Sequence, residues 1–154
     1  MQKNDCARLG GENRNGFCFV KDTNTPIFLI DRDHPTAVAT ENWWQKHEGR
    51  PEEFTGMNYG AANDPFFKVN DRPIPYPFPK KSVVVRRDLD EEEGPKTIQH
   101  EFLESQYFDK GYTYLPAHAC VLKKMQDFDY ITLEPKDVFS VLVQVLGGEL
   151  VCEI

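Results

Sequence analysis

The sequence lacks most of the patterns that identify a function directly. No apolar run approaches the roughly 20 residues that span a bilayer, and the polar start does not look like a secretory signal. No glycine-rich phosphate loop and no Cys-x-x-Cys pair occurs, so nucleotide binding, zinc ribbons and thioredoxin-type chemistry are unsupported. Basic residues are outnumbered 25 to 18 by acidic ones, and this net charge of −7 argues against nucleic acid as a partner. We therefore expect no cofactor, no membrane contact and no direct nucleic-acid binding.

Cysteine is also scarce, with Cys6, Cys18, Cys120 and Cys152 the four in the chain. Four cysteines can form two bridges, but they are too few for a disulfide scaffold. Without a secretory signal the cysteines favour reduced thiols, and we expect a cytoplasmic protein.

Apolar residues are abundant enough for a real core, at 40% of a 154-residue chain with 11 Phe, 6 Tyr and 2 Trp. We expect residues 1–15 to form a flexible N-terminal arm and residues 16–154 to form a single globular domain. The predicted fold is α+β, richer in strand than in helix. It has a mainly antiparallel or mixed β-sheet, one or two packed helices, and a long loop rich in proline and aromatic residues.

Local patterns place the expected elements along the chain. Two apolar runs, 17–20 and 27–30, predict a β-hairpin. A helix is expected over 40–49, extended upstream if Asp33 caps it and Pro35 lies in its first turn. A strand over 82–87 and a helix over 97–108 follow. Further strands are expected at 117–122, 130–133, 138–146 and 149–154; residues 137–146 also fit a helix, but their β-branched content favours a strand.

Aromatic residues concentrate around the proline-rich segment 49–79, and ordered loops with exposed aromatic rings are typical of protein interfaces. We expect an acidic intracellular protein-binding module of the inhibitor, immunity-type or accessory kind, rather than an enzyme. Its partner would be another protein, a basic one if the acidic run 88–93 attracts it, and the oligomeric state stays open. The binding residues would be Trp43, Trp44, Tyr59, Phe66, Tyr76 and Phe78.

The alternative is a cysteine-dependent hydrolase or acyltransferase. His118 lies at the start of an expected strand, and Glu134 follows another. If these strands are adjacent and antiparallel, both side chains could reach one end of the sheet. His118 would be the base, Glu134 would orient it, and the nucleophile would be Cys18, with Cys6 the other choice. His118-Ala-Cys-Val followed by Glu134-Pro resembles a short stretch in the second half of papain-like and transglutaminase-like cysteine enzymes.

One pattern suggests metal ligands. His100-Glu101-x-x-Glu104 would place a histidine and a carboxylate on a helix at the spacing of a zinc-binding HExxH motif. The second histidine of that motif is missing, so we predict no metal site.

Overall fold

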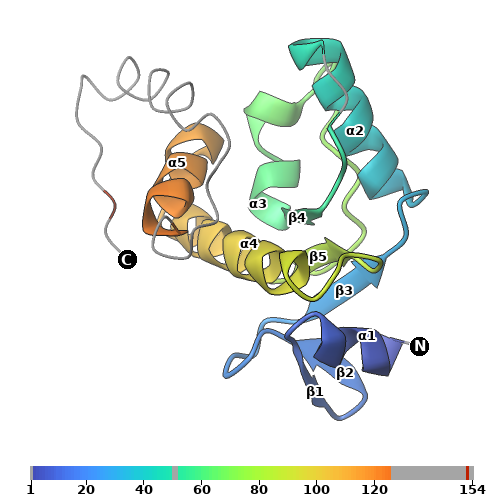
Figure 1. Ribbon diagram of the computed structural model, residues 1–154. Coiled ribbons are helices and arrows are strands. Elements are labelled where there is room, and N and C mark those ends of the chain that lie inside the picture. Colours follow the sequence, from blue (N-terminus) through green and yellow to red (C-terminus); the bar gives the residue numbers. More distant parts are fainter. Residues whose placement is uncertain (1, 50–51, 126–151, 153–154) are drawn as a thin grey trace.

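The computed structural model describes residues 2–49, 52–125 and 152 (Figure 1). These residues form an α+β fold, as expected, but with more helix than strand. In chain order its elements are α1 (Gln2–Arg8), β1 (Glu12–Arg14), β2 (Phe17–Phe19), β3 (Ile27–Ile30), α2 (Pro35–Glu48), β4 (Gly56–Asn58), α3 (Tyr59–Ala62), the 3-10 helix η1 (Pro65–Phe67), β5 (Val83–Arg86), α4 (Glu93–Asp109) and α5 (Tyr114–Met125).

A three-stranded mixed sheet forms the centre of the fold, in the order β3-β5-β4. Strand β3 runs parallel to β5, and β4 runs antiparallel to it. Val83, Val84 and Val85 of β5 are all fully buried. Their unbroken β-branched run suits a strand that is covered on both faces.

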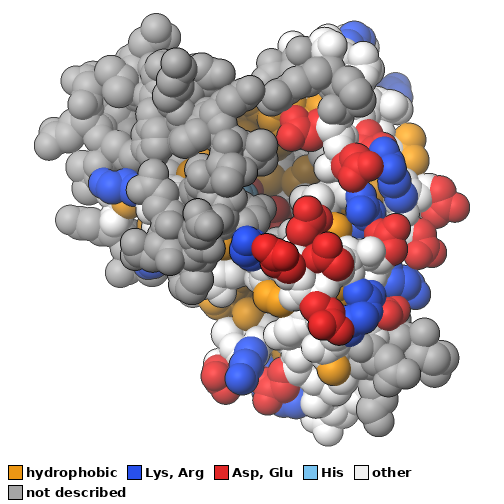
Figure 2. Space-filling model, in the orientation of Figure 1, with side chains coloured by type: hydrophobic (Ala, Val, Ile, Leu, Met, Phe, Trp, Pro, Cys, Tyr) orange, Lys and Arg blue, Asp and Glu red, His pale blue; other side chains and the backbone are white. Residues whose placement is uncertain are grey.

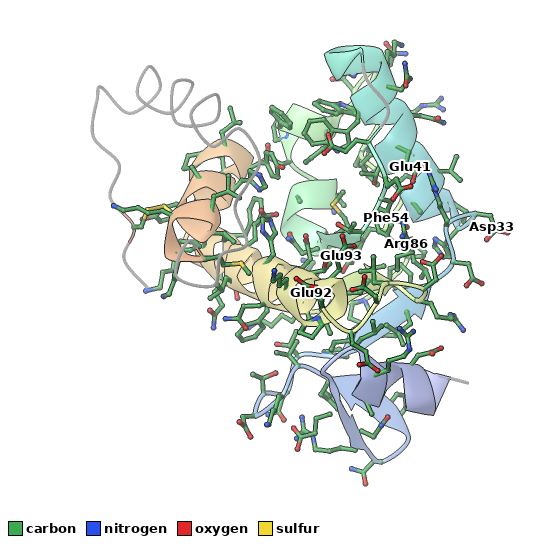
Figure 3. All side chains as sticks on the ribbon, in the orientation of Figure 1. Asp33, Glu41, Phe54, Arg86, Glu92 and Glu93 are labelled. Carbon is green, nitrogen blue, oxygen red and sulfur yellow. A yellow bond between two sulfur atoms is a disulfide. The ribbon has the colours of Figure 1, made fainter. Side chains whose placement is uncertain are left out.

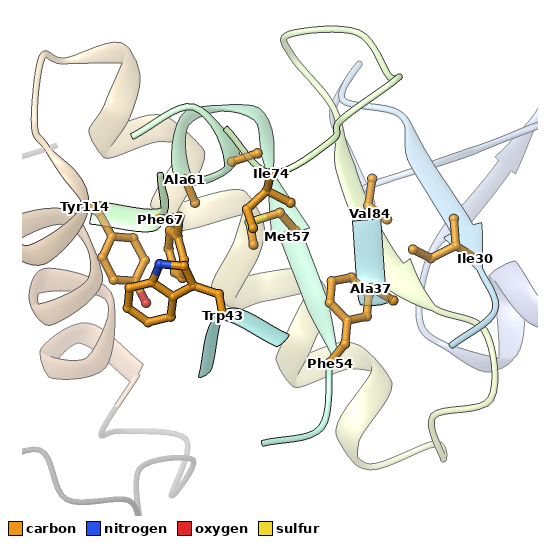
Figure 4. Close-up of a cluster of buried hydrophobic side chains, with 11 residues drawn as sticks. Ile30, Ala37, Trp43, Phe54, Met57, Ala61, Phe67, Ile74, Val84 and Tyr114 are labelled. Atoms are coloured by element: carbon orange, nitrogen blue, oxygen red, sulfur yellow. The ribbon is translucent and has the colours of Figure 1, made fainter. Parts of the chain in front are cut away.

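The alternation of side chains along β5 divides the core into two layers. Val84 packs with Met57 and with residues of α2 in a cluster that also holds Trp43 (Figure 4). Val83 and Val85 point the opposite way, into a cluster with Leu9 and with Ile98 of α4. The sheet thus separates an α2 side from an α4 side.

The first residues of the chain belong to the fold. Helix α1 is followed by the antiparallel pair β1–β2, in which Glu12 faces Phe19, and the Cys6–Cys18 disulfide joins α1 to β2. Leu9 is fully buried. We expected these residues to be a flexible arm.

The expected hairpin between 17–20 and 27–30 is wrong. Strand β2 pairs with β1, and β3 pairs with β5, more than fifty positions along the chain. A single antiparallel bridge, Phe19 to Pro26, links the two segments within the described residues. The apolar run of β3 is buried because it lies beside the central strand, and a local turn signal carries no information about that.

Helix α2 confirms the expected helix and its upstream extension. Pro35 occupies its first turn and Gly49 ends it in a left-handed conformation, with φ of 68°. The N-cap is His34 and not Asp33: its Nδ1 accepts a hydrogen bond of 3.1 Å from the backbone N–H of Thr36.

The expected strand over 117–122 is wrong, because these residues lie within α5. The strands expected at 130–133 and 138–146 lie outside the described residues, as does 149–154 except for Cys152. Residues 49–79 are ordered where described, as expected, and contain β4, α3 and η1.

The segment before β4 is anchored to both neighbouring elements (Figure 3). The backbone N–H of Phe54 donates to Glu41 of α2 at 2.8 Å, and the Phe54 carbonyl accepts from Arg86 of β5 at 3.0 Å. These two bonds set the position at which the chain enters β4.

No helix within the described residues has the length and apolar character to cross a membrane.

Candidate metal centre

Two histidines and a carboxylate converge between α4 and α5. Oε2 of Glu104 lies 3.2 Å from Nε2 of His100 and 2.9 Å from Nδ1 of His118. One potential ligand atom from each residue lies within 4.8 Å of the other two. The described residues contain no other group of three such ligands.

Helix geometry explains this convergence. His100 and Glu104 are four residues apart on α4 and therefore share one face of the helix. His118 reaches them from α5. The start of α5 is fixed because Asp64 accepts a 2.9 Å hydrogen bond from the backbone N–H of Tyr114. The Tyr114 ring stacks on the His118 ring, with centroids 5.1 Å apart, and so limits the orientation of the imidazole.

A second carboxyl group lies beside the first. Glu101 and Glu104 are both buried, and the Nδ2 group of Asn58 donates to one oxygen of each, at 2.9 Å and 3.0 Å. Asn58 comes from the end of β4, so three elements meet at the cluster. We call His100, Glu101, Glu104, His118 and Asn58 the polar cluster.

The two carboxyl groups differ in acidity because their surroundings differ. Burial and the neighbouring Glu104 raise the pKa of Glu101 to about 8, despite the opposing effects of His100 and Asn58. Burial also acts to raise the pKa of Glu104, but the hydrogen bonds and charges of His100 and His118 lower it to about 2. At neutral pH Glu104 is therefore ionised and Glu101 mostly holds its proton.

His118 is the most exposed of the three converging side chains. The side chain of Glu104 is 2% exposed and that of His100 is 9% exposed, whereas His118 keeps 23% of its side-chain surface. A small ligand would therefore approach along His118.

The cysteine-enzyme alternative is contradicted at its nucleophile. Cys18 is bonded to Cys6, and Cys120 is bonded to Cys152, so the structure contains no free thiol and the expected reduced state is wrong. Glu134 lies outside the described residues. His118 does occupy a polar site, but its partner is Glu104 and not a cysteine.

The aromatic residues expected at a binding surface pack mainly against the core. Trp43 is 6% exposed, and its ring contacts those of Trp44, Phe66 and Phe67. The Tyr76 ring contacts the rings of Tyr59 and Phe78, and its hydroxyl forms a hydrogen bond with the Ser82 hydroxyl. The six predicted binding residues therefore do not form one exposed patch.

The sequence did contain a signal for two of the three converging residues, since His100 and Glu104 stand at the expected spacing for ligands on a helix. His118 was missed as their partner because its segment looked like a strand. Asn58 carried no signal, since the proline-rich segment gives no indication of where β4 ends.

Comparisons with protein-family models, with curated proteins and with solved structures find no match to this chain.

Proposed function

We propose that this protein is a metal-dependent hydrolase whose metal ligands are His100, Glu104 and His118. The observation that carries the proposal is the convergence of two imidazole nitrogens and one carboxylate oxygen within 4.8 Å. Two histidines and one carboxylate are a ligand set used by catalytic zinc sites, which keep a further position for water or substrate.

The burial of the polar cluster supports a functional role. A buried charged network is weak evidence for stability, because well-packed apolar residues of similar volume often stabilise a fold equally well or better. Here Glu101 and Glu104 are buried on the helix that packs against the sheet. Groups of this kind, with pKa values displaced in opposite directions, are common at catalytic sites.

The ligand types favour a borderline transition metal such as zinc over calcium or magnesium. Imidazole nitrogen suits zinc, copper, iron and nickel, whereas calcium and magnesium prefer all-oxygen shells. When bound, such an ion lowers the pKa of a coordinated water to near 7 and polarises the carbonyl group under attack.

Glu101 is the proposed general base. It follows His100 directly, as the catalytic glutamate does in HExxH zinc proteases, and Asn58 holds it beside Glu104. A nearby cation would favour its ionised form. Glu101 would take a proton from water as the water oxygen adds to a carbonyl carbon. It would then return that proton to the leaving amine or alcohol as the C–N or C–O bond breaks.

The first test is metal binding. Purified protein stripped with a chelator should take up one Zn²⁺ per chain in a calorimetric titration. Loss of an outer hydrogen-bond partner of a ligand usually weakens metal binding by roughly 10–100-fold. His118→Ala removes a ligand itself and should raise the dissociation constant for Zn²⁺ by more than that. His47→Ala is the matched control, because His47 is exposed on α2 and contacts Trp43 instead of the polar cluster. Equal affinity in both variants would refute the ligand assignment.

The second test is activity. Zinc-loaded protein should cleave members of a quenched fluorescent peptide set. Glu101→Gln should keep its zinc affinity and lose activity by roughly 10²–10⁴-fold, the usual contribution of a general base. If the zinc-loaded protein cleaves neither peptide nor ester probes, the proposed hydrolase activity is refuted and only the metal site remains.

We also propose an oxidising compartment in place of the expected cytoplasm. The support is that all four cysteines are paired, Cys6 with Cys18 and Cys120 with Cys152. Such bridges persist outside the reducing cytosol. Trapping free thiols in freshly lysed cells would test this, since a cytoplasmic protein would be alkylated at all four positions.

Protein binding is the second candidate function, and a surface feature favours it. Figure 2 shows Asp and Glu side chains gathered over the start of α4, where residues 91–93 are exposed. Trp44 of α2 and Tyr59 of α3 are half-buried. A basic partner that bound at the start of α4 would lose affinity when Glu92 and Glu93 are changed to Gln; full affinity in the folded double variant would remove these two residues from the interface.

A further inference from the structure

Asn58 occupies a position where three elements meet. It ends β4, it is fully buried, and it faces α4, as does Gly56 two residues earlier. A Cβ atom built on Gly56 would lie 3.0 Å from Cγ of Glu101 and 2.7 Å from Cγ2 of Thr97. Glycine at this position lets β4 approach α4 closely enough for the Asn58 amide to reach the two carboxyl groups.

The hydrogen bonds of Asn58 fix the orientation of its amide. Its Oδ1 accepts from the backbone N–H of Ala61 at 2.9 Å. Its Nδ2 donates one hydrogen to Glu101 and the other to Glu104. A flipped amide would set Nδ2 against the Ala61 N–H and a carbonyl oxygen against two carboxyl groups, so a single orientation is stable.

We infer that Asn58 is the positioning residue of the proposed metal site, and that it holds Glu104 so that only one carboxylate oxygen is offered to the ion. The Asn58 amide donates a hydrogen bond to Oε1 of Glu104, while Oε2 faces both histidine rings. The same amide keeps Glu101 beside the site without letting it replace Glu104. This inference rests on the proposed function, because it assigns a role within the same site.

The comparison of two variants separates this role from the role of Asn58 in the local fold. Asn58 is also the N-cap of α3, through the Ala61 bond. Serine is a good N-cap but lacks the two amide hydrogens, so Asn58→Ser keeps the cap and loses both carboxyl contacts. Asn63→Ala is the matched control, because Asn63 is an exposed asparagine at the other end of α3 whose side chain donates to the Tyr59 carbonyl.

The experiment is a titration of each folded, metal-stripped protein with Co²⁺, followed by visible absorption. Asn58→Ser should raise the dissociation constant roughly 10–100-fold, the usual cost of losing an outer partner of a ligand. Its Co²⁺ spectrum should also change, because Oε1 of Glu104 becomes free to coordinate. Asn63→Ala should match the wild type in both respects. A merely structural role for Asn58 would leave the spectrum unchanged.

A second measurement on the wild type covers the case in which Asn58→Ser does not fold. The side-chain amide resonance of Asn58 should shift when Zn²⁺ is added, and that of Asn63 should stay in place. An unshifted Asn58 amide in protein that binds Zn²⁺, or a Co²⁺ affinity and spectrum that Asn58→Ser leaves unchanged, would overturn the inference and keep the metal site. Failure of the wild type to bind either ion would overturn both.

Discussion

Removing the Cys6–Cys18 bridge should cost the protein about 3 kcal/mol of unfolding free energy. The bridged residues are 12 positions apart. The chain-entropy relation for a cross-link of this size gives about 3 kcal/mol at 25 °C. The bridge also fills space, because a Cβ on Gly11 would lie 2.7 Å from Sγ of Cys18 and 2.9 Å from Sγ of Cys6. The variant with both cysteines changed to Ala therefore loses some packing as well.

The assay is urea unfolding without reductant, followed by circular dichroism. In a thermal scan, the same loss of about 3 kcal/mol would lower Tm by roughly 6–12 °C for a chain of this length. The matched control replaces Cys120 and Cys152 by Ala; these residues are 32 positions apart, and the same relation gives about 4 kcal/mol. Mass spectrometry under non-reducing conditions first confirms both bridges in the wild type. A Cys6/Cys18 variant within 1 kcal/mol of wild type, with the bridge confirmed, would refute the entropic reasoning.

Three further changes test the packing and the charges. Leu9→Ala should destabilise the protein by about 3–5 kcal/mol, because Leu9 is fully buried, whereas Val38→Ala at a 42% exposed site should change stability by less than about 0.5 kcal/mol; chemical denaturation measures both. Gly60→Ala should cost about 1–3 kcal/mol, because its Cβ would lie 2.3 Å from Cγ of Phe108, and adding Phe108→Ala should recover part of that loss in a double-mutant cycle. For the metal-free protein, the free energy of unfolding should fall as pH rises from about 4.5 to about 8, because Glu101 keeps a proton in the folded state that the unfolded chain releases. Glu101→Gln should flatten this part of the pH profile. An unchanged slope in that variant would refute the raised pKa of Glu101.

Elements with local signals could be predicted from the sequence. Pro35 and Gly49 marked the start and end of α2, and the run of three valines marked β5. Each of these signals acts within one or two turns of chain. The pairing of β3 with β5 is a long-range contact, and no residue near β3 indicates it.

The error at α5 has a different physical cause. Eight of its residues are buried, on nearly all sides of the helix, so the sequence shows no apolar stripe with a polar opposite face. Its apolar run therefore looked like a strand. That misreading also removed His118 from the helical context in which it would have completed the pattern of His100 and Glu104.

The polar cluster lies where an apolar core would be expected. Glu101 and Glu104 point into the interior where α4 meets β4 and α5, a place that an ordinary domain would fill with apolar side chains. Each carboxyl group there has hydrogen-bond partners from other elements, so the network is largely satisfied and tolerates burial. The Cys120–Cys152 disulfide lies close to it, because Cys120 is two residues from His118 on α5. A fold held in this way can retain buried charges that add little stability, and the proposed metal binding would explain why these residues are present.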